Sequence, residues 1–215
     1  MNETTCYDKP VWTLPALAAT LPSMPGHLAR VLPTVLDFTI PGKLRERIML
    51  AVAAENRCRY CKAAHASIGK AVGLDPDEID DILENRDASM PPGEALAVAY
   101  ARDLARRGFL SRDEGLRARL VEHLGDSQAE AVESTAHVMN FANRFGNTFD
   151  AAWARLSGGC ERSGASLLDM AAVSSAFLMG AAVAGPIVGT LMLYQKIQGT
   201  MSHQSGKSAG RPVAR

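Results

Sequence analysis

The chain has 215 residues, with 23 Lys or Arg and 23 Asp or Glu, so its formal net charge is zero. This length suits one sizeable domain with an appendage, and the charge balance gives no support to electrostatic capture of nucleic acid. Four cysteines do not make the disulfide framework of a small secreted protein. Residues 1–5 lack the basic and apolar segments of a secretory signal, so we expect a cytoplasmic, reducing location.

The start of the chain is rich in proline. Residues 1–26 contain Pro10, Pro15, Pro22 and Pro25, a density that a continuous helix does not tolerate. We therefore expect an extended arm over 1–26, with one short turn near 14–21. The main all-α domain is predicted to begin at residue 27, because 27–38 carries apolar residues at helical spacing.

Two helices are expected over 43–55 and 58–72, and Gly73 suits the C-terminal end of the second. If they formed one straight helix, Glu46 would lie about 18 Å along the axis from Cys58. Either the chain breaks near Asn56 and folds back, or Glu46 lies outside any site that contains Cys58. A break would place the cysteine in the first turn of a new helix, where the helix dipole favours a thiolate.

The remaining elements are also helical in pattern. Asp75 followed by a proline predicts a helix start. Further helices are expected over 94–108, from a capping box at Ser111 to about 124, and from 125 to about 149. No stretch alternates convincingly as a strand, so the fold class is predicted to be all-α, with seven or eight helices.

The motif Cys58-x-x-Cys61-x-x-x-His65 is the strongest chemical signal. On a helix these three side chains share one face, and the second cysteine and the histidine are one turn apart. An imidazole can take the proton of a thiol, and a second cysteine can close a disulfide on an oxidised first one. A buried carboxylate is the usual partner that orients such an imidazole, and Glu46 is the upstream candidate.

Three other interpretations of the motif stay open at this point. A structural disulfide is disfavoured in a reducing compartment. A zinc site needs a fourth ligand at matching spacing, and no second cysteine pair follows. A packed helix with incidental cysteines needs no chemistry at all. Redox chemistry is the favoured interpretation, with no bound metal or other cofactor.

The motif and its surroundings resemble the alkylhydroperoxidase D-like proteins of the carboxymuconolactone decarboxylase superfamily. The segment LRERIMLAVAAENRCRYCKAAH is similar to their core helix pair, and GLDPDEIDDIL to the helix that follows. The segments EALAVAYARDLAR and VMNFANRFGNTFD are similar to their last two core helices. The resemblance covers about residues 28–156.

The resemblance implies a compact multi-helix fold over 27–157 and a homo-oligomer, often a trimer or hexamer. It implies a peroxidase or disulfide reductase with a redox-active Cys58–Cys61 disulfide. Cys61 would be the attacking thiol, Cys58 the resolving one, His65 the base and Glu46 the proton relay. The reductant would be a dithiol, either thioredoxin-like or a lipoyl protein. The best-known peroxidases have a histidine where this chain has Tyr60.

One later helix carries other polar candidates. We expect His137 to be a core histidine bonded to a backbone carbonyl. Asn140, Asn143 and Arg144 share a polar stripe, and we expect them to stabilise a subunit interface rather than to bind substrate.

The C-terminal part is unusually apolar. We expect an apolar helical extension over 158–200 and a flexible basic tail over 201–215. Residues 170–195 contain no charged side chain, which is long enough to span a bilayer. Two alternatives stay open, namely membrane association through 170–195 and burial in the oligomer. The extension also motivates an alternative function, a non-catalytic scaffold that retains the family fold.

Overall fold

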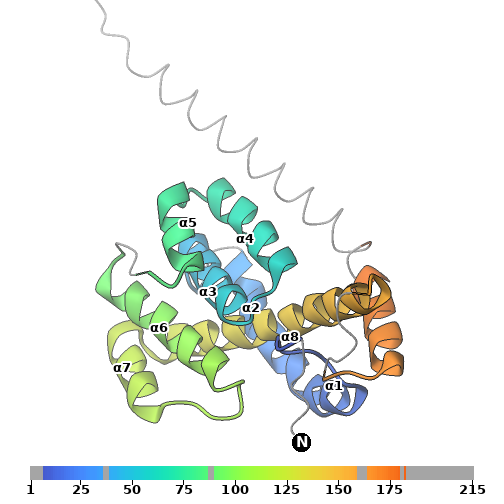
Figure 1. The fold of residues 1–215 in the computed structure, drawn as a ribbon. Coiled ribbons are helices and arrows are strands. Elements are labelled where there is room, and N and C mark those ends of the chain that lie inside the picture. Colours follow the sequence, from blue (N-terminus) through green and yellow to red (C-terminus); the bar gives the residue numbers. More distant parts are fainter. Residues whose placement is uncertain (1–6, 36–38, 87–89, 159–163, 180–181, 183–215) are drawn as a thin grey trace, which may run out of the picture. The chain divides into compact units, whose positions relative to one another are not determined.

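Helices are the only regular elements in the part of the chain that the structure, a computed structural model, describes, namely residues 7–35, 39–86, 90–158, 164–179 and 182. This confirms the all-α class. The elements are α1 Leu14–Thr20, a 3₁₀ turn Leu21–Ser23, α2 Met24–Val35, α3 Gly42–Glu55, α4 Arg59–Ala71, α5 Pro76–Leu83, α6 Pro92–Arg106, α7 Glu114–Leu124 and α8 Asp126–Leu156 (Figure 1).

The chain divides into two units, residues 1–177 and 178–215. The first unit contains all the named helices, and residues 167–177 add a further helix to it, drawn in orange in Figure 1. This helix packs on the end of α8, where Met170 and Ala165 bury Ala151. The first unit therefore extends past residue 157, where we expected the domain to end.

Helix α3 is the centre of the first unit. It packs against α4, α5, α6 and α8, and Figure 1 shows it between the α4–α5 pair and α8. Its side chains are buried on nearly all sides, the behaviour expected of a central helix. The polar Arg47 is buried as well, and its guanidinium pairs with Glu78 of α5 and Glu94 of α6. These ion pairs fix α3 against two of its neighbours.

The short turn expected near 14–21 is present, but the structure corrects the expectation that the rest of the stretch to residue 26 is extended. Helix α1, the 3₁₀ turn and the start of α2 occupy that stretch. The reason is the position of each proline: Pro15, Pro22 and Pro25 all lie in the first turn of a helical segment. A first-turn proline removes no helical hydrogen bond, so the prolines divide the stretch into short helices.

Some helix ends match the expected sequence signals and others do not. Asp75 caps α5 as expected and accepts a hydrogen bond from the Asp77 N–H. The expected capping box at Ser111 is wrong, because Asp113 caps α7 and accepts from the Leu116 N–H. Helix α8 runs on to Leu156, seven residues past its expected end.

The apolar C-terminal segment lies mostly outside the described residues. Among the helices that are described, none combines the length and apolar character that crossing a membrane requires. Residues 180–181 and 183–215 are not described. Membrane association through 170–195 and the flexible tail over 201–215 therefore stay predictions.

Candidate active site

The break between α3 and α4 brings the cysteine motif back over α3. Helix α3 ends at Glu55, and Arg57 adopts a left-handed φ of 55°. Cys58 is then extended and caps α4, with its amide bonded to the Ala53 carbonyl at 3.1 Å. The expected break near Asn56 is confirmed, and both cysteines lie at the start of the new helix.

Asparagines of α8 hold this break in place. The Asn143 amide donates to the Val52 carbonyl at 3.2 Å, and the Asn147 amide donates to the Asn56 carbonyl at 2.9 Å. The Asn56 amide in turn donates to the Asn140 side-chain oxygen at 3.1 Å. The asparagines are spaced so that they share one helix face, and each satisfies a polar group that the break leaves buried.

These contacts correct the expectation that the polar stripe of α8 serves a subunit interface. Asn140 is 8% exposed and Asn143 is fully buried, so both are used inside the chain. The Arg144 guanidinium lies 4.8 Å from the centre of the Trp12 ring, which is another internal contact. The sequence showed the stripe but not its partner, because the partner is a backbone break more than 80 residues away.

Cys58 and Cys61 form a disulfide. Cys58 is fully buried, whereas Cys61 is half-buried. The Cys61 amide lies 3.4 Å from the Cys58 sulfur, as expected for a side chain that caps a helix. Once the pair is reduced, the positive end of the α4 dipole favours thiolates at these positions.

Gly146 of α8 allows the close approach of the disulfide, although it lies outside the cysteine motif. A Cβ placed there would lie 2.8 Å from the Cys58 sulfur and 3.8 Å from the Cys61 sulfur. The first distance is too short for any side chain, so α8 can pass the disulfide only with glycine at this position. The glycine inside an otherwise helical pattern was the available signal.

The structure also brings Glu46 and His65 together. The Nδ1 atom of His65 lies 2.7 Å from Oε2 of Glu46. The carboxylate is 2% exposed, and its other oxygen accepts from Nε of Arg45 at 3.0 Å. His65 follows Cys61 by one turn of α4, so both side chains lie on one face of that helix. The four residues of the predicted site therefore form two pairs, Cys58 with Cys61 at the α3–α4 break and Glu46 with His65 between the two helices.

The metal interpretation gains no support from geometry. Within the described residues, no three His, Cys, Asp or Glu side chains are grouped so that they could hold a metal ion. The two cysteine sulfurs are bonded to each other, so neither is a thiolate ligand in this structure. The arrangement instead offers a dithiol–disulfide pair beside an imidazole and a carboxylate.

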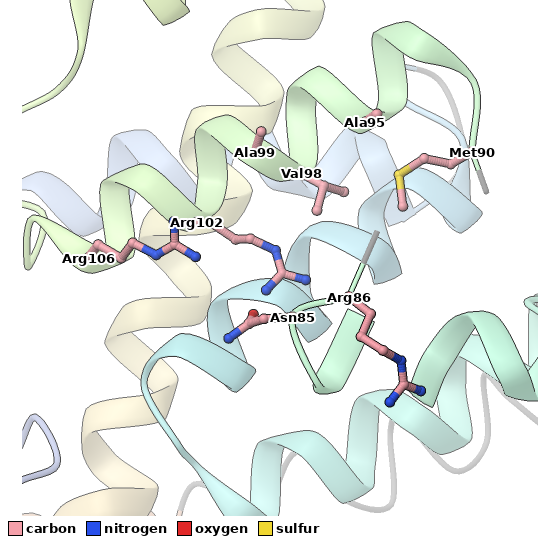
Figure 2. Close-up of a pocket in the computed structure, with 8 residues that line it drawn as sticks. All are labelled: Asn85, Arg86, Met90, Ala95, Val98, Ala99, Arg102 and Arg106. Carbon is pink, nitrogen blue, oxygen red and sulfur yellow. The ribbon is translucent and has the colours of Figure 1, made fainter. Parts of the chain in front are cut away.

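A separate cavity of about 370 Å³ lies between the end of α5 and α6. Figure 2 shows that its polar wall is arginine-rich; its lining is Asn85, Arg86, Met90, Ala95, Val98, Ala99, Arg102 and Arg106. These guanidiniums already pair with carboxylates of the chain, Arg86 with Asp81 and both Arg102 and Arg106 with Glu55. No residue of the cysteine motif lines this cavity, and carboxylates of the same chain balance the charges of its arginines.

A second pair of imidazoles lies where α2 meets α8. His137 stacks on His27, with ring centroids 4.3 Å apart, and meets the edge of Phe109 at 4.9 Å. Burial, followed by the neighbouring His27, lowers the pKa of His137 to about 4, against an opposing effect of Glu133. This corrects the expectation of a backbone-bonded core histidine: within the described residues its neighbours are rings.

One family model matches the region that contains the four residues of the predicted site. Residues 29–103 match the carboxymuconolactone decarboxylase family, and this range contains Glu46, Cys58, Cys61 and His65. A solved structure of an uncharacterised peroxidase-related protein from Silicibacter sp. TM1040 is similar at a TM-score of 0.48 and 19% identity, over 70% of each chain. No curated protein matches the chain.

Proposed function

We propose that this chain, whose residues 29–103 match the carboxymuconolactone decarboxylase family, is a thiol-dependent oxidoreductase of the alkylhydroperoxidase type. It reduces an organic hydroperoxide or a small disulfide. One observation carries the proposal: the Cys58–Cys61 disulfide shares α4 with a His65 imidazole that is bonded to the buried Glu46 carboxylate. This combination supplies a nucleophile, a resolving thiol and a proton acceptor within one site.

The burial of the two sulfurs supports a division of roles. In the reduced pair Cys61, which is half-buried, is the sulfur that a substrate reaches, and the fully buried Cys58 is the resolving thiol. His65 takes the Cys61 proton, and the Glu46 carboxylate stabilises the imidazolium that forms. The thiolate is the reactive form of the sulfur.

Two steps reduce the hydroperoxide. The Cys61 thiolate attacks the terminal peroxide oxygen, an S–O bond forms, the O–O bond breaks, and the departing alkoxide takes the proton held by His65. The products are an alcohol and a sulfenic acid on Cys61. The Cys58 sulfur then attacks the Cys61 sulfur and the disulfide closes. The proton of the Cys58 thiol leaves with the hydroxide of the sulfenic acid as water.

A dithiol completes the cycle. One of its thiolates attacks the disulfide, and a second exchange releases both cysteines as thiols and the reductant as a disulfide. A thioredoxin-like or lipoyl dithiol has the required chemistry. The proposed reaction needs no metal or other bound cofactor, because both electrons come from this dithiol.

Replacement of one sulfur tests the proposal directly. Peroxide consumption is measured with cumene hydroperoxide and excess dithiothreitol for the wild type, Cys61→Ser, Cys58→Ser and the control Cys160→Ser. We expect turnover to be lost in the first variant, while the second still oxidises once to a sulfenic acid that dimedone traps. Full turnover in Cys61→Ser would contradict the assignment.

We also propose that the enzyme works as a homo-oligomer, a trimer or hexamer. Leu28 and Leu32 lie one turn apart on α2 and are 53% and 69% exposed, so α2 offers apolar surface that a second copy could cover. Sedimentation analysis of Leu32→Glu tests this proposal. We expect a smaller species than the wild type, and an unchanged mass would exclude α2 from the contact.

A further inference from the structure

Three aromatic rings from separate parts of the first unit meet beside the disulfide. Tyr60 lies between the two cysteines, Phe149 belongs to α8, and Phe177 belongs to the helix of residues 167–177. The Tyr60 ring lies 5.8 Å from Phe149 and 6.1 Å from Phe177, and the two phenylalanine rings are 5.6 Å apart, all between centroids. We call these three residues the ring cluster.

The ring cluster differs from the aromatic packing elsewhere on α8. Trp12 packs against Phe141 and Phe145, is only 1% exposed, and donates its indole N–H to the Phe141 carbonyl. That group has the burial and the satisfied polar atom of a structural core. All three members of the ring cluster are only partly buried, so their rings keep surface available for a ligand.

Gly146 places the ring cluster against the sulfurs. A single point, the position of a Cβ on Gly146, lies 3.5 Å from Cδ2 of Tyr60, 2.8 Å from the Cys58 sulfur and 3.8 Å from the Cys61 sulfur. The Tyr60 ring edge and the disulfide therefore meet on the same patch of α8. A molecule in contact with the rings lies within reach of Cys61.

The Tyr60 ring is held in position from the solvent side. The Arg59 guanidinium lies 4.8 Å from the centre of the ring and donates to the Tyr60 hydroxyl at 2.7 Å. The same guanidinium pairs with Asp150 of α8 at 2.6 Å. A ring fixed in this way loses little conformational freedom when a ligand packs on it, which favours binding.

We propose that the ring cluster is a binding surface for an aryl group of the substrate. The inference rests on the proposed function and specifies it: the preferred substrate is an aryl-substituted hydroperoxide. Aromatic rings attract one another in edge-to-face and offset arrangements beyond the area they bury. An aryl group on the ring cluster positions its peroxide oxygen at the Cys61 sulfur, where the two steps described above proceed unchanged.

Paired reagents test the aryl preference on the full-length, reduced protein. Cumene hydroperoxide is compared with tert-butyl hydroperoxide, and N-phenylmaleimide with N-ethylmaleimide, by mass spectrometry of the Cys61 peptide. Each aryl-to-alkyl rate ratio is divided by the same ratio measured for the thiol of glutathione. We expect this normalised ratio to be about 3 to 10 in the wild type. It should fall toward one in Phe177→Ala and to an intermediate value in Phe177→Leu.

Leu168 supplies the matched control. It lies on the same helix, nine residues from Phe177 and hence on the opposite face, and it is 70% exposed. Leu168→Ala should leave both ratios at the wild-type value. Wild-type ratios equal to those of glutathione, or equal losses in the Leu168 and Phe177 variants, would overturn the aryl surface.

The two reagent pairs separate this inference from the proposed function. If neither hydroperoxide oxidises Cys61 faster than glutathione, the peroxidase proposal fails. The maleimide ratios still report whether the ring cluster recognises aryl groups. If peroxide turnover is present but shows no aryl preference, the peroxidase proposal stands and the ring cluster is structural only.

Discussion

His65 and His137 are both partly buried imidazoles on helices that pack against each other, α4 and α8, but their neighbours differ. His65 lies 2.7 Å from the Glu46 carboxylate. His137 instead stacks on the His27 ring, and burial together with that neighbour lowers its pKa to about 4. The first imidazole has a partner for a positive charge, and the second is held neutral.

This difference separates a chemical role from a packing role. A buried carboxylate is the usual partner that orients an imidazole acting as a base, and this is the role that the proposal gives to Glu46 and His65. At His137 the effects of burial and of His27 outweigh the attraction of Glu133 for a protonated ring, so this histidine serves the packing of α2 on α8. The residue type is the same in both places, and the neighbours decide what each histidine can do.

Removing the Glu46 carboxylate should abolish the difference between the two histidines and have the largest effect on activity. In Glu46→Gln the His65 ring keeps a hydrogen-bond partner but loses the charge that stabilises its protonated form. We expect peroxide consumption to fall about 100-fold, measured with a saturating dithiol. The exposed Glu122→Gln serves as the control, and a variant that keeps wild-type turnover would remove Glu46 from the mechanism.

Gly146 tests how closely α8 packs against the Cys58–Cys61 disulfide. A methyl group in Gly146→Ala would meet the Cys58 sulfur at 2.8 Å, so α8 or the disulfide must shift. We expect a loss of about 2–3 kcal/mol in the free energy of unfolding by urea. Gly26→Ala is the matched helix glycine, because its Cβ would meet only the Arg30 side chain at an ordinary 3.5 Å.

The Gly26 variant should gain slightly in stability, since alanine favours a helix over glycine. Equal stability changes in the two variants would show that the disulfide does not constrain α8. Thermal unfolding in the oxidised and reduced states adds a further check. The deficit of Gly146→Ala should be larger while the disulfide is closed.

The His137 side predicts a smaller, pH-dependent effect. The unfolded chain binds a proton at this histidine near its ordinary pKa of ~6.5, whereas the folded chain binds it only near 4. The stabilising contribution is therefore complete above about pH 6.5 and is lost as the pH falls toward 4. We expect it to amount to about 1–2 kcal/mol of unfolding free energy, allowing for partial exposure.

Replacement by a ring without a titrating group checks this sign. In His137→Phe the unfolding free energy should fall less between pH 7 and pH 4.5 than in the wild type. His123→Gln, at an exposed position, should follow the wild-type profile. An identical pH profile for all three proteins would contradict the assignment of His137 as a neutral packing residue.

The sequence predicted the cysteine motif and the two helices that carry it, because their signals are local. The spacing of Cys58, Cys61 and His65 follows from helix geometry. The break at Asn56 was one of two outcomes left open by a geometric conflict, since Glu46 lies too far from Cys58 along a straight helix. The fold class followed from the periodicity of apolar residues in nearly every segment.

Contacts between distant segments could not be predicted in the same way. Asn143 supports Val52 across 91 positions of sequence, and nothing near either residue indicates the other. Gly146 matters only because a sulfur from another helix touches it. Only one short turn was expected over residues 14–26, because the density of prolines does not show which turn of a helix each one occupies.

The most direct test of the account is the pKa of the Cys61 thiol in the reduced protein, obtained from the pH dependence of its alkylation in wild type and in His65→Ala. We predict a wild-type pKa well below the ~8.5 of a free cysteine and a clear rise when the imidazole is removed. An ordinary thiol pKa that is indifferent to His65 would contradict it, because the Cys58–Cys61 pair would then have no activated nucleophile.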